Sequence, residues 1–295
     1  MAAPGRRLAK LERQPEVPRA GGGDGPGQAP DDRPGRPSRE GRMHHPVDTE
    51  EPDGALDRAA ALLRAAGELA VLTGAGVSAE SGLATFRGGG LWEGHRVEDV
   101  ATPRAFRRDP AAVWRFYHAR RAGLRRARPN AGHYALAALE ERRGRGRFAL
   151  ATQNVDGLHR AAGSRHVLEL HGSLARVRCV ACGGREDRGA EELAELPRCG
   201  ACGGLLRPDV VWFGEPLPGD VWEEAEAAAG RCDCLLVVGT SAEVYPAAGL
   251  IDVARGRGAR VVEVNVTRTA ASARADVGLY GPSGQLLPAL VRRLG

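Results

Sequence analysis

Four cysteines in two pairs have the spacing of a metal site. Cys179 and Cys182 form one CxxC pair, and Cys199 and Cys202 form a second pair after sixteen intervening residues. A two-residue spacer lets a tight turn aim both sulfurs at one ion, and paired CxxC motifs at this separation are typical of zinc sites with four thiolate ligands. Such a site offers no open position to a substrate, so we expect one structural Zn²⁺. Two disulfides are the alternative, and they suit a cytosolic protein less well.

A glycine-rich turn is the second candidate site. Residues 74–79 read Gly-Ala-Gly-Val-Ser-Ala and follow a short apolar run at 68–73. After a buried strand, this pattern lets backbone N–H groups approach a pyrophosphate, and a helix N-terminus after the turn favours the negative charge. An ordinary dehydrogenase would also need an acidic residue about 20 residues further on. Glu93 and Glu98 lie there but in a loop-like segment, so the dehydrogenase pattern is incomplete.

Apolar runs typical of buried strands alternate along the chain with helical patterns, and these strands and helices would position the two sites. Buried strands are predicted at 68–73, 148–152, 167–170, 210–213, 235–239 and 261–266, and helices at 55–66, 130–142, 218–229, 246–255 and 284–294. This alternation predicts a doubly wound, Rossmann-like α/β fold, whose parallel sheet is covered on both faces. Cys232 and Cys234 border one apolar run and are expected in the core rather than at a metal.

Two segments interrupt the alternation. Residues 173–206 hold the four paired cysteines and two Gly-Gly pairs, and we expect a small zinc-binding module there. Residues 87–128 are rich in arginine and aromatic side chains, and we expect a helical insertion with a cofactor loop. The sheet domain would then consist of residues 54–86, 129–172 and 207–295.

The first 53 residues differ from the rest in composition. They hold almost no aliphatic or aromatic residues and are rich in Gly, Pro, Arg, Asp and Glu, so we expect a disordered tail. The tail carries nine basic and ten acidic residues, a net charge of −1, so the basic character of the chain, with a net charge of +5 in total, comes from the remaining residues, which carry +6. A basic chain with four cysteines is also compatible with a zinc-ribbon nucleic-acid binder. The low aromatic content, 4%, disfavours that class.

The sequence has no apolar run long enough for a transmembrane helix, and its first residues lack the apolar centre of a secretory signal. We therefore expect a cytoplasmic protein that binds neither a membrane nor a specific nucleic acid. A monomer is the default expectation.

Six motifs together resemble the sirtuin family. They are GAGVSAESGLATFR from residue 74, TQNVDGLH from residue 152, LELHGS from residue 168, the four cysteines, VWFGE from residue 211 and VGTS from residue 238. The resemblance runs from about residue 54 to the C-terminus, with the motifs in the family's order. It implies a lysine deacylase that consumes NAD: the acyl group moves from lysine to ADP-ribose, and nicotinamide is released.

The resemblance also assigns roles to individual residues. His171 matches the general base that acts on the ribose hydroxyls, a role suited to a group with a near-neutral pKa. Asn154 and Asp156 match residues that position the ribose and the nicotinamide amide. The residues that match cofactor contacts are Gly74, Ala75, Gly76, Glu80, Phe86, Arg87, Gln153, Asn154, Asp156, Gly239, Thr240, Ser241, Asn265 and Ser283.

The segment after residue 210 matches the family's substrate strand. In that family an acyl-lysine protein adds its own backbone as a strand, so that backbone hydrogen bonds supply most of the affinity. The matching residues here are Val211, Phe213, Gly214 and Glu215.

Three residues bear on the acyl group. Tyr117 and Arg120 are three residues apart, so a helix would place both on one face, and they resemble the pair found in sirtuins that remove malonyl, succinyl and glutaryl groups. Ala101 matches a position where a small residue leaves the acyl pocket wide. We therefore expect acidic acyl groups to be preferred, with some deacetylation. The alternatives are a plain deacetylase and an ADP-ribosyltransferase, since arginine is so abundant that a Tyr-x-x-Arg match can arise by chance.

Overall fold

A computed structural model describes residues 52–85, 94–144 and 146–295. The expected tail lies outside these residues except for its last two. These two residues, Pro52 and Asp53, already belong to the first helix, α1 (Pro52–Ala65). In the described ranges no helix is both long and apolar enough to cross a membrane.

A six-stranded sheet forms the larger lobe, in which all neighbouring strands are parallel. Its order is β3-β2-β1-β7-β8-β9. The strands are β1 (Leu69–Thr73), β2 (Phe148–Thr152), β3 (Val167–Glu169), β7 (Cys234–Val238), β8 (Arg260–Asn265) and β9 (Val277–Tyr280). The chain order reverses between β1 and β7, so their carboxyl ends flank the switch point at which open α/β sheets bind ligands.

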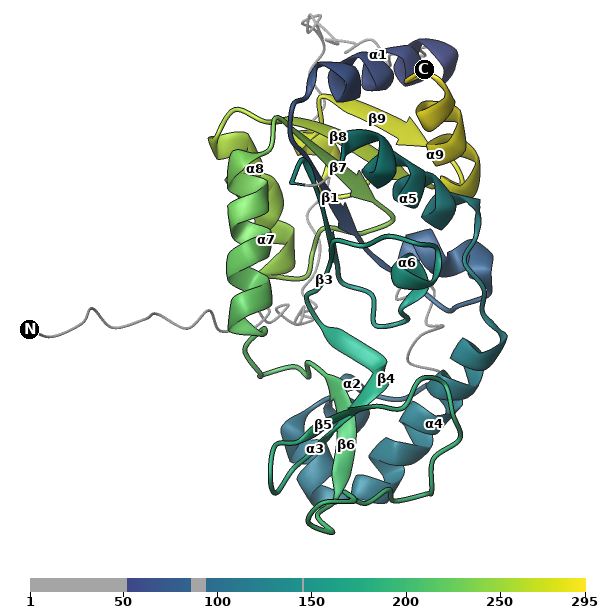
Figure 1. The fold of residues 1–295 in the computed structure, drawn as a ribbon, viewed down its shortest axis with the longest axis vertical. Helices are drawn as coiled ribbons and strands as arrows, with labels where there is room; N and C mark the ends of the chain where they lie inside the picture. Colours follow the sequence, from purple (N-terminus) through teal and green to yellow (C-terminus); the bar gives the residue numbers. More distant parts are fainter. Residues whose placement is uncertain (1–51, 86–93, 145) are drawn as a thin grey trace, which may run out of the picture.

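Helices cover both faces of this sheet (Figure 1). One face packs against α1, α5 (Ala131–Arg143) and α9 (Ser283–Arg292), and the other packs against α7 (Gly219–Arg231) and α8 (Leu250–Gly256). Leu69 and Val71 of β1 point to the first layer, whereas Ala70 and Leu72 point to the second. Both faces of the strand are thus buried, which explains its continuous apolar sequence. The expected doubly wound fold is confirmed.

A smaller lobe lies below the sheet in Figure 1. It holds an antiparallel sheet of β5 (Arg185–Asp187), β4 (Gly172–Cys179) and β6 (Leu206–Val210), with α2 (Val97–Val100), α3 (Pro103–Arg108) and α4 (Pro110–Arg126) beside it. Thr102 and Asp109 cap α3 and α4 with their side chains, and each cap precedes a proline at the first helical position. The helical insertion and the cysteine-bearing module therefore share one core.

Three details correct the sequence-based expectations. Residues 210–213 do not form a strand of the parallel sheet, because the chain pairs antiparallel to β4 as β6 and leaves the strand after Val210. The sixth parallel strand is β9, which was not predicted because it is short and contains Gly278. The Gly-rich turn leads into a seven-residue 3-10 helix, η1 (Ala75–Ser81), which ends at Gly82 with φ 79°.

Three further short elements lie in the connections that follow β2, β7 and β8. They are α6 (Leu158–Ala161), η3 (Ala247–Gly249) and η4 (Ser272–Arg274). The described residues expected to bind the cofactor lie in the turn after β1 and in η1, after β2, after β7, at the end of β8 and at the start of α9.

Candidate active site

The Gly-rich turn packs against the turn after β7. Gly74 N donates to Val238 O at 3.0 Å, and Gly76 N donates to Gly239 O at 2.8 Å. A Cβ on Gly74 would lie 2.7 Å from Cβ of Thr240, and Gly239 has φ 59°. Glycine is therefore required by the close approach of the two backbones. Ala75 lies between the two glycines, so the same two hydrogen bonds fix the position of its backbone.

Thr240 ties three strand ends together. Its Oγ1 accepts a hydrogen bond from Gln153 Nε2 at 2.9 Å, and its carbonyl accepts one from Asn265 Nδ2 at 2.9 Å. The following turn contains Ser241 and then Ala242, whose φ of 56° is rare for a residue with a Cβ. The expected contacts from β2, β7 and β8 thus meet in one place.

Ser78 is the centre of a buried polar network beneath this edge. Its Oγ donates to Asp156 Oδ2 at 2.7 Å and accepts from Asn154 Nδ2 at 3.1 Å. His133 Nε2 lies 3.3 Å from the same oxygen, and His133 Nδ1 accepts from the amide of Asn130. Nε2 of His133 must therefore carry the proton and donate to Ser78. Each proton in the network has a defined place.

Burial sets the protonation of this network. It lowers the pKa of His133 to about 4, so the ring is neutral at pH 7. It also raises the pKa of Asp156, while hydrogen bonds from the amide of Leu158 and from Ser78 oppose that rise. Each carboxylate oxygen of Asp156 accepts one of these hydrogen bonds, and both bonds favour the charged form of the side chain.

A second buried chain of hydrogen bonds positions Asn154. The amide of Asn154 donates to Thr152 Oγ1 at 3.1 Å, and Thr73 Oγ1 donates to the same oxygen at 2.8 Å. Thr73 in turn lies 2.9 Å from His159 Nε2, so this ring nitrogen carries a proton. The position of Asn154 therefore depends on residues from β1, β2 and α6.

His171 has the geometry of a base. It follows β3, and its Nδ1 lies 3.0 Å from Gln153 O. A carbonyl oxygen can only accept, so Nδ1 carries the proton and the neutral ring keeps a lone pair on Nε2. Burial lowers the pKa of His171, against the effect of this hydrogen bond. The unprotonated form required of a base is thus the form present at neutral pH.

Glu80 and Ser283, two of the expected cofactor residues, form a hydrogen bond with one another. Glu80 Oε1 accepts from Gly284 N at 2.8 Å and from Ser283 Oγ at 3.2 Å, at the start of α9. A carboxylate at this helix end satisfies free backbone N–H groups. Phe86 and Arg87, the other residues expected in the cofactor loop, lie outside the described residues.

The expected substrate segment is a turn held between the two lobes. Val211 N donates to His171 O at 2.9 Å, and Phe213 N donates to Ala101 O at 3.0 Å. Phe213 is 40% exposed, and Gly214 follows with φ 88°. The segment therefore runs directly from the candidate base to the helical insertion.

The Glu215 side chain points inward to brace this segment. Its carboxylate accepts from Arg207 Nη1 at 2.6 Å, from Arg207 Nη2 at 2.9 Å and from the amide of Trp212 at 2.9 Å. Arg207 is almost fully buried and also donates to Val210 O at 2.8 Å. Glu215 thus acts on the segment through Arg207 and the backbone.

Tyr117 and Arg120 lie next to one another on α4. The Arg120 guanidinium carbon lies 5.8 Å from the centre of the Tyr117 ring, and Tyr117 is only 2% exposed. Burial raises the pKa of Asp156 and the positive charge of Arg120 opposes that rise, which places Arg120 within electrostatic reach of the strand ends. Ala101 is buried in the same core as Tyr117.

The four paired cysteines come together as a metal site would require. Their sulfur atoms all lie within 4.8 Å of one another, with Cys179 and Cys202 at 3.5 Å and Cys182 and Cys199 at 3.8 Å. Four ligands at about 2.3 Å from a tetrahedral ion would be about 3.8 Å apart. All four cysteines are free, so the geometry fits Zn²⁺ and not two disulfides. Cys232 and Cys234 are buried in the sheet core, as expected.

Comparison with known proteins decides the family. The model of the Sir2 family matches residues 74–246. This chain belongs to the Sir2 family. It is 54% identical to NAD-dependent protein deacylase 2 of Pyrobaculum aerophilum over 239 residues, which cover 79% of this chain and 93% of that protein. It is 52% identical to the NAD-dependent protein deacylase of Thermococcus kodakarensis over 248 residues, which cover 81% and 95% of the two chains.

Solved Sir2 structures agree with the fold. A Sir2 homologue in complex with NAD is 45% identical, with a TM-score of 0.76 over 81% of this chain and 93% of that chain. A Sir2 protein bound to a myristoylated histone peptide is 37% identical, with a TM-score of 0.67 over 82% and 97%. The sirtuin resemblance of the six motifs is thereby confirmed.

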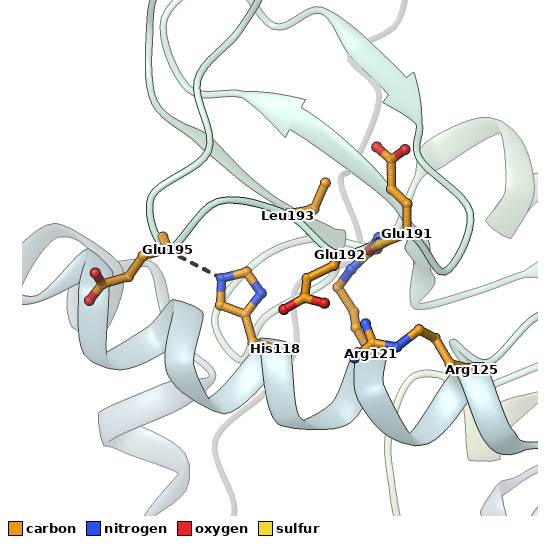
Figure 2. Close-up of a pocket in the computed structure, with 7 residues that line it drawn as sticks. All are labelled: His118, Arg121, Arg125, Glu191, Glu192, Leu193 and Glu195. Carbon is orange, nitrogen blue, oxygen red and sulfur yellow. Dashed lines mark hydrogen bonds between the residues drawn. The ribbon is translucent and has the colours of Figure 1, made fainter.

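This Sir2 chain also has a cavity away from the strand ends. It measures about 290 Å³ and lies between α4 and residues 191–195. Figure 2 shows His118, Arg121 and Arg125 projecting from α4 towards Glu191, Glu192, Leu193 and Glu195. Tyr117 and Arg120 occupy the neighbouring stripe of α4, so this pair and the cavity lie on different sides of the helix.

Several site residues of this Sir2 chain were missed by sequence reasoning. They are Thr73, Ser78, His133, Thr152, His159 and Trp212. Each is a buried residue whose partner lies far away in the sequence, such as Ser78 with Asp156. The available signals were positions inside the quoted motifs: Ser78 in the Gly-rich turn, Thr152 and His159 at the two ends of TQNVDGLH, and Trp212 in VWFGE.

Proposed function

We propose that this Sir2 chain removes acidic acyl groups of the succinyl, malonyl and glutaryl kind from lysine side chains of proteins, and acetyl groups more slowly. The coarser activity, NAD-dependent protein deacylation, comes with the family and with relatives about 50% identical. Family membership does not select the acyl group, because similar Sir2 structures hold a myristoylated histone peptide in one case and a deacetylated p53 peptide in another.

The pairing of Tyr117 with Arg120 carries the proposal. Both residues belong to one stripe of α4, with the Arg120 guanidinium 5.8 Å from the Tyr117 ring centre. A planar cation and a phenol hydroxyl side by side can bind a carboxylate through charge-assisted hydrogen bonds. An acetyl group offers no charge in return for the desolvation of Arg120. Ala101, small and buried in the same core, leaves room for the longer acyl chain.

The remaining chemistry assigns a task to each strand end. NAD, when bound, supplies the ribose to which the acyl group is transferred. His171 Nε2 accepts a proton from a ribose hydroxyl, because Nδ1 is already committed to Gln153 O. Asn154 and Asp156, fixed by Ser78, orient the ribose and the nicotinamide amide. The backbone of residues 211–215 pairs with the substrate backbone.

The test uses one peptide sequence carrying acetyl-, succinyl-, malonyl- or glutaryl-lysine, with NAD, and mass spectrometry of the products. We expect free lysine, nicotinamide and O-acyl-ADP-ribose, with a higher kcat/KM for the acidic acyl peptides. Acetyl-lysine turned over as well as succinyl-lysine contradicts the proposed selectivity. ADP-ribose attached to the peptide, in place of deacylation, would identify a transferase instead.

Arg120→Met sharpens the test. Loss of a hydrogen bond to a charged group costs about 1.5–3 kcal/mol, so kcat/KM for succinyl-lysine should fall about 10- to 150-fold. The acetyl reaction does not use this charge and should change far less. Arg115→Met is the matched control, because Arg115 is an exposed arginine on the same helix.

A further inference from the structure

Trp212 contacts the acyl-binding pair from behind. It follows β6, is 1% exposed and belongs to the same buried core as Tyr117. Its Nε1 donates a hydrogen bond to Tyr117 Oη at 2.8 Å, with the ring centres 6.3 Å apart. No motif or neighbouring residue in the sequence indicates this contact, because 95 residues separate the two side chains.

The direction of this hydrogen bond determines what Tyr117 can offer. An indole N–H can only donate, so Tyr117 Oη is the acceptor and its own proton is not used in the contact. Within residues 94–144 and 146–295, the Tyr117 hydroxyl has no second hydrogen-bond partner. The phenol proton is therefore available for donation to a substrate group. A carboxylate, which only accepts, is the complement of that proton.

Trp212 cannot readily turn to a different partner. The Arg207 guanidinium carbon lies 3.4 Å from the centre of the indole ring, and Phe106 packs at 5.2 Å. The amide of Trp212 is held by Glu215 at 2.9 Å, and Glu215 in turn holds Arg207. A stacked cation and a fixed backbone together define the indole orientation. The N–H therefore points at Tyr117 before a substrate arrives.

We infer that Trp212 is a specificity-determining positioning residue, which directs the Tyr117 hydroxyl proton towards the carboxylate of an acidic acyl group. The inference rests on the proposed function. Without the indole N–H, the hydroxyl can rotate and present a lone pair, which repels a carboxylate but has little effect on an acetyl methyl group. The effect of Trp212 on substrate choice thus passes entirely through Tyr117.

The experiment is a mutant cycle that measures the ratio of kcat/KM for succinyl-lysine to kcat/KM for acetyl-lysine. Trp212→Phe removes the N–H and keeps a ring under Arg207, and the ratio should fall about 3- to 10-fold, as expected for one neutral hydrogen bond. Tyr117→Phe should lower the ratio at least as much. In the Tyr117→Phe background, Trp212→Phe should leave the ratio unchanged, because the acceptor is already gone.

Trp114→Phe is the matched control. Trp114 is buried in the same core, but its Nε1 donates to the backbone carbonyl of Leu206 at 2.9 Å. Its replacement disturbs packing to a similar extent and should leave the ratio within about twofold of the wild type. If Trp212→Phe does not fold, 3-benzothienylalanine at position 212 keeps the bicyclic ring and replaces the N–H by sulfur.

Three outcomes would overturn the inference. An unchanged ratio in folded Trp212→Phe, with Arg120→Met still losing succinyl turnover, removes the role of Trp212 alone. If Trp212→Phe lowers the ratio by the same factor in the Tyr117→Phe background as in the wild type, its effect is one of general packing and does not pass through Tyr117. A wild-type protein without preference for succinyl-lysine removes both this inference and the proposed function.

Discussion

Replacing Glu215 by glutamine tests how this side chain supports residues 211–215, the proposed substrate segment. The change keeps the side-chain shape and removes the charge that faces Arg207, whose side chain is 7% exposed beside the 18% exposed Glu215. Removing one partner of a buried ion pair costs about 3–5 kcal/mol. The lower end of this range applies here, because Glu215 is partly exposed. Arg207 also keeps its hydrogen bond to the carbonyl of Val210 and its contact with the Trp212 ring.

The expected loss of about 3 kcal/mol corresponds to a fall in Tm of about 6–12 °C for a domain of this size. Tryptophan fluorescence suits the measurement, because Trp114 and Trp212 both lie in the affected core. The KM for the acyl peptide should rise, since residues 211–215 lose their brace, while the KM for NAD should change little. Exposed Glu68, which pairs with Arg231 at 3.1 Å, provides the control: Glu68→Gln should lower Tm by less than about 2 °C.

The pH dependence follows from the pKa of Glu215. Burial alone would raise this pKa, but the hydrogen bonds from Arg207 and from the Trp212 amide lower it below the ordinary value. A carboxyl whose pKa is depressed on folding stabilises the protein above the unfolded pKa of about 4.5, and this contribution is lost as the pH falls through the folded value. The Tm difference between wild type and Glu215→Gln should therefore narrow below about pH 4. A variant that melts within about 2 °C of the wild type at pH 7 would refute the brace.

Three further predictions concern the base, the metal and the glycine turn. Because burial lowers the pKa of His171, the fall of kcat/KM with decreasing pH should have its midpoint below the ordinary imidazole value of about 6.5, and a midpoint at or above pH 7 contradicts the assignment. His171→Ala should lower kcat about 10²- to 10⁴-fold without changing Tm. Cys199→Ser should abolish the single bound zinc in metal analysis and lower Tm, whereas Cys232→Ser should keep the metal. Gly74→Ala should raise the KM for NAD about tenfold or more, equivalent to about 1.4 kcal/mol, because its Cβ would lie 2.7 Å from Thr240 Cβ, and unchanged NAD kinetics would oppose this.

The sequence was most informative where the signal is local. The CxxC spacing placed the four cysteines at one site, and uninterrupted apolar runs located β1 and β2 to within a residue. These features depend on residues close together in the chain, so one sequence is enough to recognise them.

Contacts between distant residues were beyond the reach of the sequence. An apolar run at 210–213 fits a parallel strand as well as the end of β6, because periodicity does not identify the sheet to which a strand belongs. His133 and Ser78 are 55 residues apart, and each alone has the appearance of an ordinary core residue. The direction of the Trp212 hydrogen bond required coordinates, because it depends on how α4 lies against the turn after β6.

Helix α4 meets the cysteine-bearing module through donors that lie on the helix and acceptors that belong to the backbone of the module. Trp114 donates to Leu206 O, His118 contacts Glu195 O, and Arg121 donates to the carbonyls of Leu174 and Glu191. Every residue type has a backbone carbonyl, so the side chains at the two exposed acceptor positions, Glu191 and Glu195, can diverge among descendants of this chain without moving the helix. Leu174 and Leu206 are held in addition by the core that they share with α4. The donors on α4 have no such freedom. Sequence drift is therefore tolerated at these two exposed acceptor positions, whereas the helix that carries Tyr117 and Arg120 must keep its donor side chains.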